Sequence, residues 1–327
     1  MRRRSFIAAV GATAAAWPLL TRASDRLPRI GYLSPAPADA DKPLFEAFEV
    51  GLGEFGLVPG QTVAVEARFV GGDDEKLSAQ ARELVGLGVD VIVTIGPGVF
   101  IAHKAGPTIP IVMAAYGAID ELVSMGLVAS LAHPGGVVTG QTFLLSQLFM
   151  KRVELLKQVK PAMTRVGLLV LRGSVFNQFR PALEAQIRAL GLVPEPIEIS
   201  APDDCDATLA SGPGASIGGL LVPEEPQFSV GPGPAAIAAA ALRHRVPAAG
   251  PFSFAASGGL FSYDVDLPPM ARRAAYFVDR ILKGAKPGDI PTEQATKFVT
   301  IINLQTAKAL GIDLPPTLLA AADEVIE

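Results

Sequence analysis

The chain has 327 residues, half of them hydrophobic, and a net charge of −4 with its three histidines neutral. This length and apolar content predict a large core, most simply shared between two domains. The excess of acidic residues argues against binding to nucleic acid or to anionic membranes. The single cysteine, Cys205, excludes a disulfide bond within the chain.

The amino-terminal segment 1–23 has the pattern of an export signal. Three arginines at residues 2–4 precede an Ala-rich apolar run over 6–20, and a small-residue cleavage site follows at 21–23. The run is too short to cross a bilayer. The arginine-rich start fits a twin-arginine signal and a general secretory signal equally well. Without this segment 24 basic residues face 32 acidic ones, a net charge of −8, and we expect a soluble periplasmic protein.

Short apolar runs alternate with amphipathic segments through the first half, as expected for a parallel sheet covered by helices. Strands are predicted at 29–34, 63–66, 89–94 and 109–114, and helices at 44–55, 73–87, 99–106 and within 119–131. The stretch 132–142 comes next. Its Pro-Gly-Gly at 134–136 stops a helix and an extended run begins at Val137, which predicts a strand crossing between two lobes.

The second half repeats this order of elements. Strands are predicted at 165–170, 197–199, 218–222 and 246–249, with a helix at 179–190. Residues 30 and 166, in the first strand of each half, lie 136 apart. The run Gly-Leu-Val-Pro at 56–59 recurs at 191–194, a nearly identical spacing. Such constant spacing indicates a duplicated αβ lobe with right-handed crossovers.

The tail of the chain, from residue 258 onward, does not fit either lobe alone. An extended run at 258–263, a helix at 268–283, a turn-rich linker at 284–291, a strand at 297–302 and a helix at 304–310 follow one another. They predict two further crossings, three in all. The fold class is therefore α/β, with two similar lobes that each hold a mainly parallel sheet. We assign residues 24–140 and 263–294 to lobe 1, and residues 141–262 and 295–327 to lobe 2.

Motifs for catalysis are weak. Gly-Ala-Ser-Ile-Gly at 214–218 matches a hydrolase nucleophile elbow as a string, but a strand follows Ser216 where the motif needs a helix. The run 231–236 resembles a dinucleotide fingerprint, yet its prolines remove backbone donors and no acid follows at the required distance. His103, His133 and His244 have no metal-ligand spacing among themselves or with Cys205. We predict no enzyme, no cofactor and no metal.

The loops after the predicted strands are the candidate ligand site, because open αβ sheets bind ligands at the carboxyl ends of their strands. Backbone N–H groups after Thr94 suit a carboxylate. Glu224 suits an amine, Arg172 an acid, and Tyr116 or Phe252 an apolar ring. The full set of candidates is Ser34, Gly96, Pro97, Gly98, Tyr116, Thr142, Arg172, Asn177, Glu224, Phe252 and Asp264.

Several motifs resemble one known family over nearly the whole chain. They lie at 89–93, 108–112, 126–131, 134–140 and 151–156, and most specifically in the tail at 279–287, 296–298, 302–304, 306–311 and 322–326. The chain resembles the substrate-binding proteins of ABC transporters, of the tryptophan/tyrosine-type periplasmic family. The resemblance implies a type I periplasmic-binding fold and capture of a small solute in the inter-lobe cleft by hinge closure. It also implies a monomer that delivers this solute to an inner-membrane permease with its ATPase.

The chain departs from the family pattern at positions expected to face the cleft. Residues 116–120 replace a common Gly-Asp-Pro run, residues 171–174 replace an Asn-Pro loop, and His133 and Val137 replace Arg and Asn. The aromatic amino acids that the family name implies are therefore not assigned to this chain as its ligands. The expected ligand is amino-acid-like or a small carboxylate.

Two alternative functions stay open. An exported α/β hydrolase would need a nucleophile, a base and an orienting group close together. A ligand-sensing partner of a membrane kinase would differ from a transport receptor in its genomic neighbours.

Overall fold

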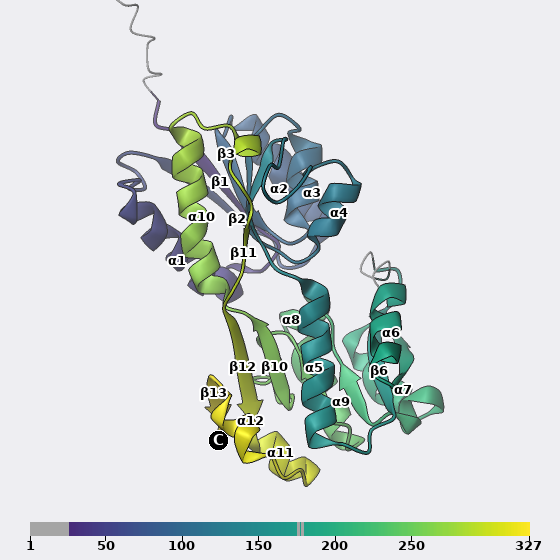
Figure 1. Ribbon diagram of the computed structural model, residues 1–327. Coiled ribbons are helices and arrows are strands. Elements are labelled where there is room, and N and C mark those ends of the chain that lie inside the picture. The colour runs from purple at the N-terminus through teal and green to yellow at the C-terminus, as the bar shows by residue number, and fades with distance from the viewer. Residues whose placement is uncertain (1–25, 175–176, 178–179) are drawn as a thin grey trace, which may run out of the picture.

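The computed structural model describes residues 26–174, 177 and 180–327, which form two αβ lobes joined at a narrow waist (Figure 1). The predicted residues 1–23 of the export signal lie outside the described part. The sheet of lobe 1 has the order β11-β5-β4-β3-β1-β2, and the sheet of lobe 2 has the order β13-β12-β10-β9-β8-β6-β7. The prediction of two α/β lobes with mainly parallel sheets is confirmed.

Lobe 1 is a fully parallel sheet with helices on both faces. Its strands are β1 (Arg29–Ser34), β2 (Ala64–Phe69), β3 (Val91–Ile95), β4 (Ile111–Tyr116), β5 (Val138–Thr142) and β11 (Glu293–Gln294). Its helices are α1 (Ala38–Glu54), α2 (Asp74–Gly86), α3 (Gly98–Ala105), α4 (Ile119–Ser124) and α10 (Leu267–Leu282). Helices α1 and α10 cover one face and α2, α3 and α4 the other (Figure 1), each over its own apolar cluster.

Lobe 2 repeats the plan with one antiparallel pair, β10 with β12. Its strands are β6 (Arg165–Leu171), β7 (Val193–Ile199), β8 (Gly219–Leu221), β9 (Ala248–Gly250), β10 (Phe261–Val265), β12 (Phe298–Asn303) and β13 (Glu324–Ile326). Its helices are α5 (Leu145–Val159), α6 (Arg180–Ala189), α7 (Cys205–Leu209), α8 (Pro226–Ser229), α9 (Gly233–Arg243), α11 (Leu304–Leu310) and α12 (Pro316–Ala320).

Local sequence explains where the helices begin and end. The Asp73 carboxylate accepts a 3.0 Å hydrogen bond from the N–H of Lys76 and so caps α2. Asn303 caps α11 in the same way through Thr306, at 2.9 Å, and Gly311 ends that helix with φ +69°. In lobe 2, β7 begins at Val193, earlier than the predicted start at 197. It is an edge strand, where Pro194 and Pro196 are tolerated.

The chain passes between the lobes three times, after β5, after β10 and after β11. Hydrogen bonds tie these crossings together. The N–H of Ala295 donates to the Thr142 carbonyl at 2.7 Å, and the N–H of Asp266 donates to the Lys297 carbonyl at 3.2 Å. Strand β10 stays in the sheet of lobe 2 as far as Val265, because it pairs with β12 there. The chain therefore changes sheet after Val265, and the expected change at 262–263 falls inside β10.

The waist also has apolar contacts. Ala115 of β4, Phe143 of the first crossing and Met270 of α10 belong to one buried cluster with residues of lobe 2. In the described part of the chain no helix combines the length and apolar character needed to cross a membrane.

Candidate functional site

The strands of lobe 1 and strands β6 to β10 of lobe 2 direct their carboxyl ends at the waist, whereas β12 and β13 run the other way. Strand β5 enters the first crossing at Thr142 and is parallel to β4, while β10 enters the second at Val265 and is parallel to β9. We call the region between these two sets of strand ends the junction. The two lobes come close together beside the junction. If Gly72 of lobe 1 carried a Cβ atom, that atom would lie 3.9 Å from the Cβ of Pro226 of lobe 2.

On the side of lobe 1, Ser34 ends β1, and Gly96, Pro97 and Gly98 form a tight backbone turn between β3 and α3. Ser34 is 1% exposed, and its hydroxyl oxygen accepts the N–H of Ala36 at 3.1 Å. A Cβ at Gly98 would lie only 2.0 Å from Thr94 Oγ1, so glycine is required where α3 begins. Gly96 has φ +54° and its N–H donates to a carbonyl of β4 at 3.0 Å. With Pro97 as N-cap, the turn sets the amino end of α3 at the end of β3.

Tyr116 and Thr142 have hydroxyl groups that bond within the protein. The Tyr116 hydroxyl donates to Glu121 Oε2 at 2.7 Å, and its ring meets Phe100 edge-on at 5.8 Å between centroids. Burial, with the Glu121 hydrogen bond, raises the pKa of the Tyr116 phenol. Thr142 is fully buried and donates to the Tyr116 carbonyl at 2.6 Å. Both residues hold the junction in shape from lobe 1.

Arg172 and Asn177, the first two candidates of lobe 2, lie in the loop after β6. The Arg172 side chain is 66% exposed, with its Nε 3.9 Å from Glu198 Oε2. The Asn177 side-chain amide donates to the Leu171 carbonyl at 2.9 Å. The structure therefore places Arg172 beside edge strand β7 and uses Asn177 to fold the loop.

The other three candidates of lobe 2 come together around Arg152. The guanidinium of Arg152 is fully buried and donates to Glu224 Oε1, and its Nη2 lies 3.8 Å from Asp264 Oδ2. Asp264 also accepts the N–H of Phe252 at 3.1 Å and the N–H of Val265 at 2.8 Å. Phe252 as a whole residue is 43% exposed. We call Arg152, Glu224 and Asp264 the charged cluster.

The charged cluster holds two carboxyl groups against one cation. Burial raises the pKa of Glu224 to about 7, although the charge of Arg152 opposes the rise. Burial also raises the pKa of Asp264, again against the effect of Arg152. Glu224 Oε2 is buried and has no hydrogen-bond partner among the described residues. The cluster therefore has unused capacity to accept a hydrogen bond at the strand ends of lobe 2.

The neighbouring Glu225 is also buried in lobe 2 and bonds to the loop after β6. It is 4% exposed, and its Oε1 accepts the hydroxyl of Ser174. Burial raises the pKa of Glu225, and the negative charge of Asp74, at the start of α2, raises it further. Glu225 is thus close enough to sense a charge on the opposite lobe.

Arg152 was not singled out from the sequence as a site residue, whereas Glu225 was predicted as part of the same strand-end loop as Glu224. A usable signal existed for Arg152. The apolar stripe of α5 runs through residues 145, 148, 149, 153 and 156, and Arg152 interrupts it with a charge. A buried arginine needs charged or carbonyl partners, so its place in that stripe predicts a buried polar cluster.

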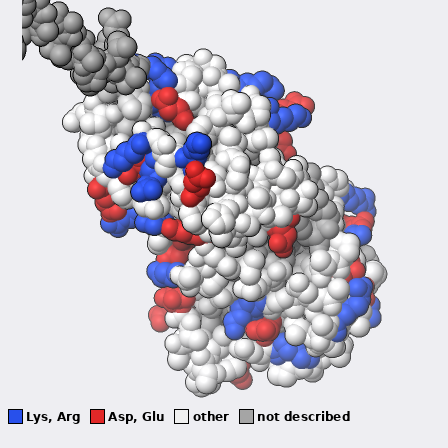
Figure 2. All heavy atoms as spheres, turned by 45° about the horizontal axis from the view of Figure 1, so that its top comes forward, with Lys and Arg blue, Asp and Glu red and all other residues white. Residues whose placement is uncertain are grey.

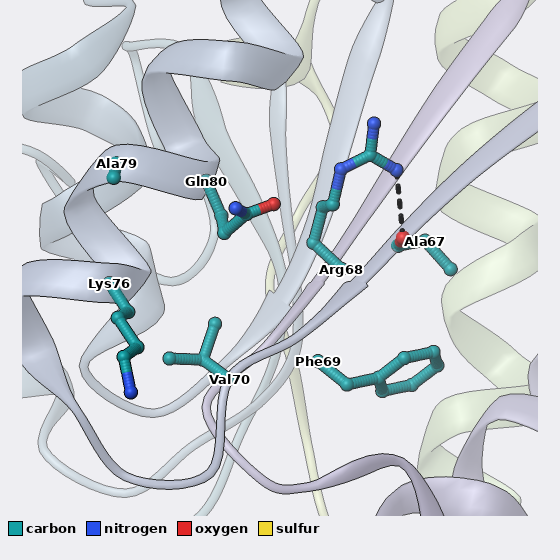
Figure 3. Close-up of a pocket in the computed structure, with 7 residues that line it drawn as sticks. All are labelled: Ala67, Arg68, Phe69, Val70, Lys76, Ala79 and Gln80. Atoms are coloured by element: carbon teal, nitrogen blue, oxygen red, sulfur yellow. Dashed lines mark hydrogen bonds between the residues drawn. The ribbon is translucent and has the colours of Figure 1, made fainter.

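Other parts of the molecule offer less to a ligand. A hollow of about 280 Å³ lies entirely within lobe 1 and is lined by residues of β2, by Val70 just after it and by residues of α2. Figure 3 draws these residues. Arg68 in its wall already bonds the Ala67 carbonyl and the Glu83 carboxylate. Figure 2 shows basic and acidic side chains interspersed over both lobes on the face drawn. Within the described ranges no three His, Cys, Asp or Glu side chains are placed to hold a metal.

Ser216 is not set in a nucleophile elbow. It ends a short 3₁₀ helix, Gly212–Ser216, that precedes β8, and its hydroxyl donates to the Pro213 carbonyl at 2.8 Å. The order of elements is the reverse of what the hydrolase motif requires.

Both the sequence and the fold are similar to those of known proteins. A family model described as ABC transporter substrate binding protein matches residues 38–326. The chain is 26% identical over 270 residues to the tyrosine-binding protein of Clostridioides difficile, covering 82% of this chain and 76% of that protein.

Two solved structures have the same fold. A Streptococcus pneumoniae ABC domain in complex with L-Trp is 24% identical, with a TM-score of 0.79, and covers 92% of this chain and 100% of its own. A conserved domain protein of Vibrio cholerae is 22% identical, with a TM-score of 0.80 and the same two coverages. The type I periplasmic-binding fold is thereby confirmed.

Proposed function

The chain belongs to the family of ABC transporter substrate binding proteins, and from this premise we propose that it captures a small amino-acid-like solute or carboxylate between its lobes and delivers it to an ABC permease. Members of this family bind solutes and are not enzymes, and the chain is accordingly a solute-binding protein.

The charged cluster is the observation that carries the proposal. A buried Arg152 with two carboxyl groups is costly to maintain in a protein interior. Here it stands at the strand ends of lobe 2. The N–H groups at the start of α3 suit a carboxylate, while Glu224 and Asp264 suit a cation. A solute with both groups would span the junction and draw the lobes together.

The relatives support an amino-acid-like solute. One is named as a tyrosine-binding protein, and the Streptococcus pneumoniae structure is in complex with L-Trp. Phe252 is an exposed hydrophobic residue whose backbone N–H bonds to Asp264 of the charged cluster, and it would be available to an apolar side chain of the solute. The three crossings would act as the hinge of a closing motion.

Export and partnership complete the proposal. Residues 1–23 would direct the chain to the periplasm by the twin-arginine or the general secretory route, and the mature protein would act as a monomer beside an inner-membrane permease and its ATPase. Cell fractionation of the full chain, with and without the arginines at residues 2–4, tests the export step.

A thermal-shift screen of the protein lacking residues 1–23 tests the function. The panel holds the twenty L-amino acids, their decarboxylated amines and their deaminated carboxylates. A ligand present at a hundred times its dissociation constant adds about 2.7 kcal/mol of stability. We expect at least one compound to raise the melting temperature. If none does, while ester or amide turnover is detected, the chain is not a solute receptor.

A further inference from the structure

The donors of Arg152 are committed to fixed acceptors. Its Nε donates to the Tyr263 carbonyl at 2.9 Å, its Nη1 to the Val222 carbonyl at 3.2 Å, and its Nη2 to Glu224 Oε1. The side chain is fully buried, with the Phe149 ring 5.7 Å from its Cζ. Arg152 is therefore a rigid support that fixes one oxygen of Glu224 and leaves the other to find its own partner.

The two carboxyl groups differ in what they still lack. Both oxygens of Asp264 accept backbone N–H groups, from Phe252 and Val265. Glu224 has one satisfied oxygen, while Oε2 is buried without a partner in the described structure. A buried anionic oxygen with no donor is unstable, so this oxygen takes up either a proton or a donor group supplied by a ligand.

We propose that Glu224 receives a primary ammonium group of the solute, and that the ammonium displaces a proton which Glu224 Oε2 carries in the empty protein. This inference rests on the proposed function and specifies it, since it requires a solute with a cationic group. Part of the Glu224 side chain, 18%, stays exposed. A small adjustment of the terminal carboxyl torsion, which is soft in glutamate, then presents Oε2 to the junction while Oε1 stays bonded to Arg152.

The exchange balances in charge and in protons. Near pH 7 about half of the empty protein molecules hold Glu224 as a carboxylic acid, and the exchange takes place in these. On binding, the O–H bond of that acid breaks, the proton passes to the solvent, and an N–H of the ammonium donates to the resulting carboxylate. No other bond changes, and the solute stays an ammonium ion throughout.

The groups around Glu224 favour this proton balance. Arg152 faces it from α5, and Asp264 and the Tyr263 backbone face it from β10. Burial and the negative charge of Asp264 raise the pKa of Glu224 to about 7, against the opposing effect of Arg152. Glu225, next along the chain, turns away to Ser174. At neutral pH the carboxyl is thus balanced between its two protonation states, and one added cation is enough to decide the outcome.

The consequence is an affinity that depends on pH. If only the ionised form of Glu224 binds the ammonium, the apparent dissociation constant rises as pH falls through the pKa of about 7. Between pH 8 and pH 6 the affinity should weaken about tenfold. Binding near pH 7 should release about half a proton per solute.

Isothermal titration calorimetry of the protein lacking residues 1–23 tests this proposal. The titrant is the compound with the largest shift in the amino acid, amine and carboxylate panel. Titrations at pH 6, 7 and 8, each in phosphate and in imidazole, give the protons released from the difference in heat between the two buffers. The wild-type protein should release protons and lose affinity at low pH.

Glu224→Gln should bind more weakly at pH 8, release no proton and show a flat pH profile. Glu154→Gln is the matched control, because Glu154 lies close to Arg152 in the sequence of α5 with its side chain 50% exposed. It should behave as wild type. Melting curves of both variants verify that they are folded.

Two outcomes overturn the inference while the receptor function stands. One is a best ligand that lacks any cationic group, and the other is proton release by Glu224→Gln equal to that of wild type. The absence of binding by any compound to the wild-type protein counts instead against the proposed function.

Discussion

The two lobes are copies in their scaffold and differ in the chemistry at their strand ends. Gly56 and Gly191, the repeated glycines after the helix that follows β1 in lobe 1 and β6 in lobe 2, have φ angles of +73° and +74°. At the junction this likeness stops. In lobe 1 the hydroxyls of Thr94 and Tyr116 bond within the lobe, whereas lobe 2 carries the buried Arg152 with its two carboxyl groups. Duplication preserved the frame, and we propose that discrimination between solutes resides in lobe 2.

Removal of Arg152 should have the largest effect on stability. Arg152→Met leaves Glu224 and Asp264 buried without their cation, which should cost about 3–5 kcal/mol. Urea unfolding measures this loss. Arg68→Met in lobe 1 is the comparison, since Arg68 is partly exposed beside Glu83 and Glu66 and should cost about 1 kcal/mol or less. Equal losses in both variants would remove the contrast between the lobes.

The second-largest difference between the lobes is expected in the pH dependence of the free energy of unfolding. The folded pKa of Glu224, about 7, lies above its ordinary value of 4.5, so the native state keeps a proton that the unfolded chain has lost. This stabilising contribution is complete below about pH 4.5 and is lost as pH rises through 7. Relative to Glu224→Gln, the unfolding free energy of wild type should fall by up to about 3 kcal/mol across that window. A constant difference between the two proteins from pH 4.5 to 7 would contradict the pKa assigned to Glu224.

The smallest effect is expected from Tyr116→Phe in lobe 1. The change removes only the 2.7 Å hydrogen bond to Glu121 and should cost about 1 kcal/mol. Because that hydroxyl is engaged within lobe 1, solute affinity should change less than twofold. Melting curves and calorimetry on the same preparation give both values, and a large loss of affinity at unchanged stability would make Tyr116 a solute contact.

The frame could be predicted from the sequence because it depends on local, repeated signals. Apolar runs marked the buried strands, and the recurring Gly-Leu-Val-Pro revealed the duplication. The start of β7 could not be predicted because prolines argue against a strand unless it lies at a sheet edge. Nothing in the local sequence shows that β7 is an edge strand.

The site was predicted only in outline. Position after a strand identified Glu224, Phe252 and Asp264, which do meet in the structure. The same rule could not separate them from Arg172, which lies exposed beside Glu198. Arg152 was not predicted as a site residue because its partners lie in β10 and just after β8. Both are distant from it in the sequence, and only the fold brings them together.

The affinity of the panel's best ligand for two variants, one in each lobe, tests the central claim most directly. Calorimetry at pH 8 should show Glu224→Gln binding about ten- to a hundredfold more weakly than wild type, the loss expected for a hydrogen bond between charged groups. Tyr116→Phe should bind as wild type does. If Glu224→Gln keeps full affinity while Tyr116→Phe loses it, recognition resides in lobe 1 and the account is wrong.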